Sequence, residues 1–311
     1  MPEGEELTPG TMPLYPTCAN GNFLGLPDES SQRETSSVIV LPVPYDRTTS
    51  YKSGTKDGPA AILSASTQVE LYDRFYQSEP ALEYGIHTLP PLSPNLSSPD
   101  ATIQLIAEAV SELANEAQLL VVIGGEHSIS SGVSRGLNSV YGDFVTVQLD
   151  AHADLRDTYE GTRFSHACAA RRISEISSIF QIGIRSLDVT EADYINHNAG
   201  TVTTIFAEDA LEDDSYLRSL AAFVSKKNVF LTIDVDVFDP SIIPATGTPE
   251  PDGLNWRDVV KIIKTVCDNG HVVALDCVEL MPIPGTHVSE FTVAKLLYRA
   301  INMIQKSRGA F

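Results

Sequence analysis

The sequence predicts an α/β protein built on a three-layer, doubly wound and mainly parallel sheet with helices on both faces. Segments that are almost wholly apolar recur along the chain, and such segments are typical of parallel strands buried on both faces. They alternate with segments of helical periodicity, as in right-handed βαβ units. The chain has 311 residues, of which 42% are hydrophobic. This is enough for one large core, so we expect a single domain over residues 36–311.

The expected elements follow one another in order. Residues 1–35 are rich in Pro, Gly, Ser and Glu without periodicity, so we interpret them as an irregular arm, with a neighbouring subunit as its expected packing partner. Helices are predicted at 59–71, 101–117 and 288–307 from the spacing of apolar residues. The last helix has a predicted buried face made of Val288, Phe291, Leu296, Ala300 and Ile304. Strands are predicted at 37–44, 119–123, 144–150, 179–184, 201–206, 229–236 and 271–276.

The net charge of −20 argues against two classes of partner. So acidic a surface repels nucleic acid and anionic membranes, and we expect neither as a partner. Most of the charge is expected to form a solvated surface, although it could also attract a cationic substrate. The acidic N-terminus is unlike a signal peptide, and no apolar run approaches the ~18 residues that span a bilayer.

The cysteines indicate the redox environment. None of the four, Cys18, Cys168, Cys267 and Cys277, belongs to a C-x-x-C pair. Their spacing fits neither a zinc ribbon nor a small disulfide scaffold. We therefore expect reduced cysteines in a cytoplasmic protein.

Three polar clusters directly follow apolar strands, and ligands of parallel sheets bind beyond these carboxyl ends. The first cluster, GGEHS, occupies residues 124–128. Its two glycines allow the backbone to turn tightly, and His127 follows at once. Alone, this histidine is compatible with a structural role as well as with that of a ligand.

The second cluster, DAHAD, occupies residues 150–154. In an extended segment every second side chain points the same way, so we expect Asp150, His152 and Asp154 on one side. Two carboxylates this close repel each other and are costly to bury unpaired, unless a cation lies between them. A metal ion removes both problems, and the alternative is an acidic loop at the start of a helix.

The third cluster, TIDVDVFDP, occupies residues 232–240. Asp234 and Asp236 share a face by the period of two, whereas Asp239 has the opposite parity. Because Pro240 ends the strand, we expect Asp239 to be structural and to cap the next turn. The Pro- and Gly-rich loop 244–253 is suited to forming the floor of a pocket.

Together the three clusters supply two histidines and four aspartates. These are too many ligands for one small ion and too acidic a set for a zinc site of the Cys/His type. They suit two bridged, roughly octahedral ions, for which manganese fits best and nickel, cobalt and iron remain alternatives. Two ions ~3.5–4 Å apart can share a water and lower its pKa, which makes hydroxide at neutral pH.

The motifs GGEHS, DAHAD and IDVDVFDP, in this order, resemble the signature motifs of the ureohydrolase superfamily of arginases and agmatinases. The resemblance runs from about residue 42 to residue 297, and YDRTTSYKSGTKDGPAAILSAS and VELYD resemble the agmatinase branch. Glu126 stands where many members have Asp, and Ala245 and Asp252 replace glycines that are common in the loop of the third motif. The resemblance implies an arginase-like catalytic domain over residues 36–311 and a homo-oligomer, either a trimer or a hexamer.

The resemblance also implies a role for each site residue. One ion would be held by His127, Asp150, Asp154 and Asp234, and the other by Asp150, His152, Asp234 and Asp236, with Asp150 and Asp234 bridging. His166 matches the histidine that shuttles protons near the departing amine, and Glu279 matches the acid that binds the guanidinium. An amine leaves well only when protonated, and a carboxylate can pair bidentately with a guanidinium. Without the resemblance, we would interpret His166 as a helix-start histidine and Glu279 as a surface acid.

The implied reaction is hydrolysis of a linear guanidino compound to urea and an amine, with agmatine, which gives putrescine, as the favoured substrate. Arginase-like members have an Asn at the position of Arg156, which argues against arginine. Arg156 is also awkward for a cationic tail if it faces the pocket, unless Asp157 or Glu160 neutralises it. Aminopropylagmatine, guanidinobutyrate or another guanidino acid, guanidine and formiminoglutamate remain alternatives.

Two other classes of protein fit the sequence less well. A non-catalytic, metal-binding relative is disfavoured because all six ligands, His166 and Glu279 are present. A metallophosphatase-like hydrolase should carry Asn and further His ligands, which the predicted strand ends lack.

Overall fold

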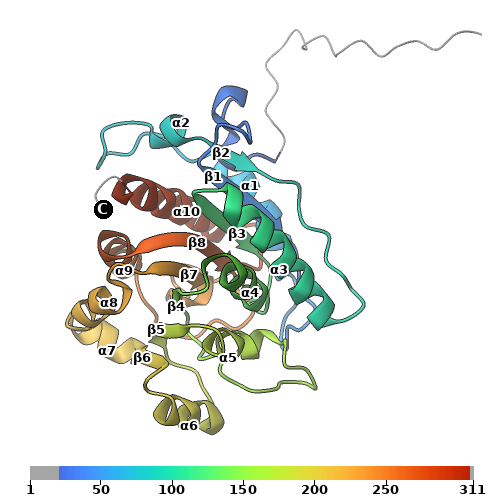
Figure 1. Cartoon of the computed structure of the whole chain (residues 1–311), viewed down its shortest axis with the longest axis vertical. Coiled ribbons are helices and arrows are strands. Elements are labelled where there is room, and N and C mark those ends of the chain that lie inside the picture. The colour runs from blue at the N-terminus through green and yellow to red at the C-terminus, as the bar shows by residue number, and fades with distance from the viewer. Residues whose placement is uncertain (1–20, 309–311) are drawn as a thin grey trace, which may run out of the picture.

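A computed structural model describes residues 21–308, and its centre is one sheet of eight strands (Figure 1). The strands lie in the order β2-β1-β3-β8-β7-β4-β5-β6, and all neighbouring pairs are parallel. The chain begins with β1 beside one edge, forms β2 at that edge and β3 on the inner side of β1. It continues through β4 and β5 to β6 at the other edge and returns through β7 and β8 to the middle, which is a doubly wound topology. The predicted α/β architecture is therefore confirmed.

The strands are β1 (Val38–Val43), β2 (Ile86–Thr88), β3 (Leu119–Gly124), β4 (Val145–Leu149), β5 (Ser178–Ile184), β6 (Val202–Phe206), β7 (Asn228–Asp234) and β8 (His271–Val278). The α-helices are α1 (Gly58–Ser66), α2 (Pro80–Tyr84), α3 (Pro99–Glu116), α4 (Ile129–Tyr141), α5 (Ala169–Ser174), α6 (Val189–His197), α7 (Ala207–Glu212), α8 (Tyr216–Val224), α9 (Trp256–Asn269) and α10 (Val288–Ser307). The short 3-10 helices are η1 (Phe23–Gly25), η2 (Asp28–Ser30), η3 (Thr55–Asp57), η4 (His166–Cys168) and η5 (Val235–Val237).

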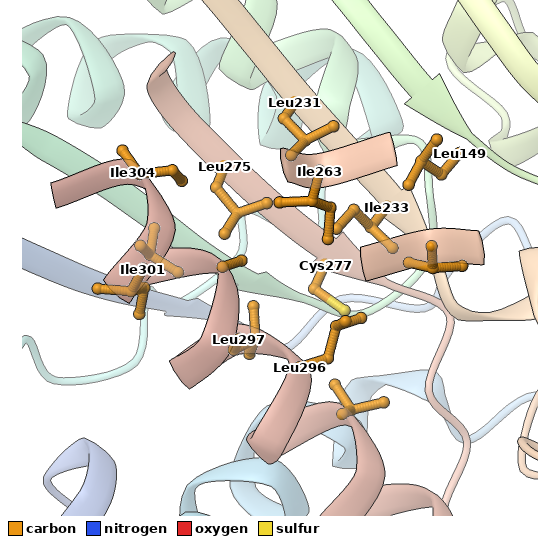
Figure 2. Close-up of a cluster of buried hydrophobic side chains, with 14 of the residues drawn as sticks. Leu149, Leu231, Ile233, Ile263, Leu275, Cys277, Leu296, Leu297, Ile301 and Ile304 are labelled. Atoms are coloured by element: carbon orange, nitrogen blue, oxygen red, sulfur yellow. The ribbon is translucent and has the colours of Figure 1, made fainter. Parts of the chain in front are cut away.

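The sheet has a hydrophobic core on each face, which explains why its strands are apolar throughout. Successive residues of β1 point alternately into the two cores, as Val38 and Ile39 illustrate. Helices α1, α8, α9 and α10 cover one face, where side chains such as Leu275 and Ile301 interlock (Figure 2). Helices α3, α4 and α5 cover the other. Both faces are thus buried, as the near-continuous apolar runs predicted.

Several predicted elements differ in their details. Strand β2 was missed because three residues are too few to show a period. Helix α1 ends at Ser66, five residues before the predicted end. Helix α10 has the predicted bounds, but in its first turn Val288 and Phe291 are exposed, whereas Ser289 and Glu290 between them are buried. The predicted buried face was therefore wrong in that turn.

The predicted arm falls partly on residues 1–20, which lie outside the described residues. Residues 21–35 form two short 3-10 helices rather than longer elements. Phe23, Leu24 and Leu26 are nevertheless buried in the core under α1 and α10. Residue 36 is therefore not a break in packing, which the composition of this segment did not indicate.

The three described cysteines, Cys168, Cys267 and Cys277, are buried and free, as expected of reduced cysteines, while Cys18 lies outside the described residues. Within residues 21–308, no helix is both long and apolar enough to cross a membrane.

Candidate metal centre

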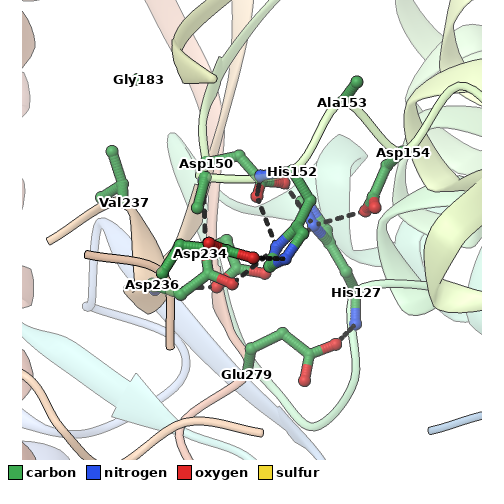
Figure 3. Close-up of polar contacts among 12 residues, drawn as sticks. His127, Asp150, His152, Ala153, Asp154, Gly183, Asp234, Asp236, Val237 and Glu279 are labelled. Carbon is green, nitrogen blue, oxygen red and sulfur yellow. Dashed lines mark hydrogen bonds and ion pairs between the residues drawn. The ribbon is translucent and has the colours of Figure 1, made fainter. Parts of the chain in front are cut away.

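The three polar clusters meet at one edge of the sheet. Strands β3, β8, β7 and β4 are neighbours in its middle, and their carboxyl ends lead into His127, Glu279, Asp234 and Asp150 (Figure 3). Strand ends that are consecutive in space thus bring together residues up to 152 positions apart in sequence. Ligands of parallel sheets bind at this edge.

His127 reaches the site through a tight turn after β3. A Cβ on Gly125 would lie 1.9 Å from the carbonyl oxygen of Tyr45, so only glycine allows the loop to pass there. The imidazole of His127 is buried, and its Nε2 lies 3.0 Å from the hydroxyl of Thr232 on β7. This contact turns Nδ1 toward the carboxylates.

The first group of side chains surrounds that nitrogen. Nδ1 of His127 lies 3.0 Å from Asp150 Oδ2, 3.1 Å from Asp154 Oδ2 and 3.4 Å from Asp234 Oδ2. Despite these distances, Nδ1 makes no hydrogen bond. A buried nitrogen facing three carboxylate oxygens without a hydrogen bond is the arrangement expected around a cation.

The second group is built around His152. Its Nδ1 lies 2.9 Å from Asp236 Oδ2 and 3.8 Å from Asp150 Oδ1. Asp150 therefore belongs to both groups: one set is His127, Asp150 and Asp234, and the other is Asp150, His152 and Asp236. Within each set the ligand atoms lie within 4.8 Å of one another.

Backbone groups hold the carboxylates in place. Asp150 accepts from the N–H of His152 at 2.7 Å and from the side chain of Gln148 at 2.6 Å. Asp236 accepts from the N–H of Ala151 at 3.0 Å, which joins the second and third clusters. Asp234 accepts from the N–H of Asp236 at 2.9 Å. In Asp234 and Asp236, one oxygen thus fixes the loop and the other points to a histidine.

The expected period of two does not describe these loops, although the residues that it selected do lie close together. Strand β7 ends at Asp234, and Asp236 lies in the 3-10 turn η5. Asp154 has φ of 53°, a left-handed conformation, so the segment after Asp150 is not extended. Turns, rather than a continuous strand, bring the side chains together.

The electrostatics of the cluster show how poorly it tolerates being without a cation. Burial and the charge of Asp236 raise the pKa of Asp150, and burial with the charge of Asp150 raises the pKa of Asp154 to about 7. For His152, burial lowers the pKa, but the charge of Asp236, the hydrogen bond to it and the charges of Asp150 and Asp154 together raise the pKa to about 11. Protons on these groups offset the crowded negative charge here, and divalent ions would do so more effectively. The residues therefore fit a pair of ions.

Glu279 follows β8 in a left-handed conformation, with φ of 65°. Its Oε1 accepts from the N–H of His127 at 2.7 Å, and its own N–H donates to the carbonyl of Gly125 at the same distance (Figure 3). The side chain is buried, yet it lines the cavity in front of the ligands. It is therefore not the surface acid that local sequence alone suggested.

His166 lies at the start of η4, as predicted for a helix-start histidine, and it also lines the cavity. Its Nε2 lies 3.4 Å from the hydroxyl of Ser50, and the ring meets the edge of Tyr159 at a centroid distance of 5.9 Å. Burial lowers the pKa of His166 to about 4. The imidazole is therefore neutral at pH 7 and able to accept a proton.

The cavity has a volume of about 200 Å³ and brings the predicted site residues together with others. Arg156 does face it, but the expected partners Asp157 and Glu160 were wrong. Its guanidinium lies 3.4 Å from Asp188 and 3.6 Å from Glu191, and 4.7 Å from the ring of Tyr159. These acids belong to the start of α6, which the local sequence could not place beside Arg156.

The loop before η3 lines another side of the cavity, and the sequence did not indicate that Glu126 holds this loop in place. Glu126 accepts from both the N–H and the hydroxyl of Thr48, at 2.5 Å each. The same hydroxyl accepts from the backbone N–H of His166 at 3.0 Å. Burial raises the pKa of Glu126 to about 7. Glu126 thus connects the first cluster to Thr48 and, through the hydroxyl of Thr48, to the backbone of His166.

Asp239 and the loop after it behave largely as predicted. Asp239 accepts from the N–H groups of Ser241, Asp252 and Gly253, so it is a turn cap rather than a ligand. Gly247 and Thr248 of the Pro- and Gly-rich loop line the cavity.

Comparison with known proteins agrees with this geometry. A model of the Arginase family matches residues 36–302. The N(1)-aminopropylagmatine ureohydrolase of Synechocystis sp. is 36% identical over 85% of this chain and 88% of its own. The agmatinase of Pyrococcus horikoshii is 33% identical over 86% of this chain and 92% of its own. The crystal structure of agmatine ureohydrolase of Thermoplasma volcanium superposes with a TM-score of 0.81 at 27% identity, covering 94% of this chain and 97% of that one.

The family match spans most of the chain and includes every strand and every residue of the two ligand groups. The protein therefore belongs to the arginase family.

Proposed function

We propose that the enzyme hydrolyses the guanidino group of N(1)-aminopropylagmatine to urea and spermidine, with agmatine as a slower substrate. As an arginase-family member it is a hydrolase of C–N bonds in guanidino compounds, with a site for two divalent ions. The sequence favoured agmatine. The order is reversed because the relatives at 33–36% identity from Synechocystis sp., Thermus thermophilus and Thermococcus kodakarensis are named for the longer substrate.

We assign the ions to the residues predicted by resemblance. His127, Asp150, Asp154 and Asp234 would hold one ion, and Asp150, His152, Asp234 and Asp236 the other, with Asp150 and Asp234 bridging. Support comes from the two groups that share Asp150 and from the 3.1 Å approach of Asp154 to His127. Four carboxylates and two imidazoles favour manganese.

The chemistry assigned to the chain needs two further groups. Bound divalent ions would supply hydroxide at neutral pH. Glu279 has one oxygen on the N–H of His127, which leaves its second oxygen for the guanidinium of the substrate. Addition of water to the guanidino carbon and cleavage of its bond to the chain nitrogen give urea and an amine.

His166 would carry the proton in this reaction. Because its pKa is lowered to about 4, it is neutral when substrate arrives and cannot bring a proton with it. It would first accept the proton released as water adds, and then donate it to the nitrogen that leaves as an amine. Its place in the cavity, beside Ser50 and Tyr159, supports contact with that nitrogen.

The observation that carries the choice of a cationic tail is the charge around Arg156 and Glu191, which both line the cavity. One cation, Arg156, faces two carboxylates, Asp188 and Glu191, so this group keeps an excess of negative charge. Burial raises the pKa of Glu191, but two backbone N–H groups and Arg156 favour its charged form. A tail bearing ammonium groups would be attracted here.

A guanidino acid is the second candidate. Arg156 is held by charge and by the ring of Tyr159, rather than by a hydrogen bond to a described residue. Lys52 also lines the cavity. Two cations with free donors could bind a carboxylate tail.

Urea release from N(1)-aminopropylagmatine, agmatine, guanidinobutyrate and arginine, measured with Mn²⁺ and Ni²⁺, tests the proposal. We expect kcat/KM to fall in the order given and arginine to be inert. Arg156→Gln should lower KM for the two amines several-fold and raise it for guanidinobutyrate. A preference for guanidinobutyrate that Arg156→Gln abolishes would instead establish the second candidate.

We also propose a cytoplasmic homo-oligomer, a trimer or hexamer. Exposed apolar side chains, among them Tyr72, Phe75, Val288 and Phe291, support burial against other subunits.

A further inference from the structure

Arg185 follows β5 directly, and its guanidinium donates hydrogen bonds to the backbone. Its donors reach six main-chain carbonyl oxygens: those of Asp236 (2.7 Å), Glu250 (2.9 Å), Pro251 (2.9 Å), Gly183 (3.0 Å), Phe238 (3.4 Å) and Val237 (3.5 Å). These oxygens come from the end of β5, from the turn that carries Asp236, and from the loop that closes the cavity.

No carboxylate of residues 21–308 forms an ion pair with Arg185, although the protein has a net charge of −20. Arginines commonly pair with carboxylates, whereas here the planar guanidinium binds main-chain carbonyl oxygens. The backbone also approaches it closely, since a Cβ on Gly253 would lie 2.7 Å from Nη2. The half-buried side chain therefore lies in close contact with the segments that it joins.

The backbone of Arg185 holds the other ligand loop. Its N–H donates to the carbonyl of Ala151 at 2.8 Å, and the N–H of Ser186 donates to the same oxygen at 3.0 Å. Ala151 lies between Asp150 and His152, and its own N–H donates to Asp236. One residue thus connects both loops that supply the second group of ligands.

The loop that Arg185 holds also faces His152. The carboxylate of Glu250 lies 3.9 Å from Nε2 of His152, the ring nitrogen that points away from Asp236. A carboxylate on this side favours a proton on Nε2 and leaves Nδ1 free to coordinate.

We propose that Arg185 is a positioning residue for the ion held by Asp150, His152, Asp234 and Asp236, and not for the other ion. The proposal rests on the ligand assignment given above. Asp236 serves this ion only, and the guanidinium of Arg185 binds its carbonyl oxygen. The guanidinium contacts no carbonyl of His127 or Asp154, which serve only the other ion. Loss of the Arg185 guanidinium should therefore weaken the binding of one ion selectively. The expected factor is the 10- to 100-fold that residues hydrogen-bonded to metal ligands typically contribute to metal affinity.

The test is Mn²⁺ binding to purified, chelator-treated full-length protein. Arg185→Lys keeps the charge and loses the planar guanidinium, and Arg185→Met loses both. Arg308→Lys is the matched control, because Arg308 likewise donates to two carbonyls, those of Gln118 and Val272, at the opposite end of the sheet. Bound metal per chain, the electron paramagnetic resonance signal of coupled against isolated Mn²⁺, and the melting temperature without metal are measured on each preparation.

We expect two ions per chain in the wild type and in Arg308→Lys. Both Arg185 variants should hold one tight, magnetically isolated ion and a second bound at least tenfold more weakly. Two tight ions in both variants, or parallel loss of both ions with a fall in melting temperature, would overturn the proposal. A wild type that binds fewer than two ions would instead show that the ligand assignment has failed.

Discussion

Replacing Glu279 by Gln tests the central step of the proposed reaction, because the change preserves shape and removes one charge. Oε1 accepts from the N–H of His127 at 2.7 Å, and an amide oxygen can accept the same bond. The fold and the turn around His127 should therefore survive. What is lost is the charge that faces the guanidinium of the substrate.

The size of the effect follows from hydrogen-bond energies. Bonds to charged groups contribute about 1.5–3 kcal/mol and neutral bonds about 0.5–1.5 kcal/mol. One oxygen of Glu279 is left for the substrate, and in the glutamine variant the amide nitrogen takes its place and cannot accept from the guanidinium. The variant should therefore lose one charged bond of about 1.5–3 kcal/mol. At tenfold per ~1.4 kcal/mol, kcat/KM should fall by roughly 10- to 150-fold.

The assay is urea release at several substrate concentrations, with metal content measured on the same samples. Glu290→Gln is the control for loss of a buried carboxylate, since Glu290 is buried in the first turn of α10 and does not line the cavity. Glu279→Gln should keep both ions while its kcat/KM falls. Glu290→Gln should keep both ions and a kcat/KM close to that of the wild type. Activity within threefold of the wild type would refute the role of Glu279.

Other predictions concern the metal ligands, the proton carrier, the backbone and the assembly. Asp150→Ala and Asp234→Ala should each lose both ions, and two ions at normal occupancy in either would contradict the bridging assignment. His166→Asn should keep both ions while turnover falls by roughly 10²–10⁴, and near-normal turnover would reassign the proton to solvent. His166 has a pKa of about 4 when folded against about 6.5 unfolded, so its contribution to stability is complete above pH 6.5 and declines as the pH falls through 4. The loss should approach about 3 kcal/mol, and denaturant unfolding of His166→Asn should lack this pH dependence. Gly183→Ala should lower the unfolding free energy by about 1–3 kcal/mol, because φ is +99° and the new Cβ would lie 2.8 Å from Val237; an unchanged denaturation midpoint would count against this. Light scattering should give three or six times 33.7 kDa, and the mass of one chain would refute the oligomer.

The sequence alone was sufficient to predict the parallel architecture of the sheet and to select the candidate ligands that the structure brings together. Strand periodicity and apolar runs are local signals, and burial on both faces leaves them uninterrupted by polar residues. The candidate ligands lie at or just after the ends of strands, so their order along the chain already places them at one edge of a parallel sheet. The prediction of Asp239 as a turn cap succeeded for the same local reason.

Only the tertiary structure decided which side chains meet across that edge. Glu126 holds Thr48 across 78 positions, and Arg156 pairs with acids at the start of a later helix, not with its neighbours in sequence. The contacts of Arg185 with main-chain carbonyls could not be predicted from the types of side chain in the sequence, because every residue carries the same main-chain acceptor. Local periodicity determines which face of a strand a residue occupies, whereas the conformations of the intervening loops determine which loops face one another.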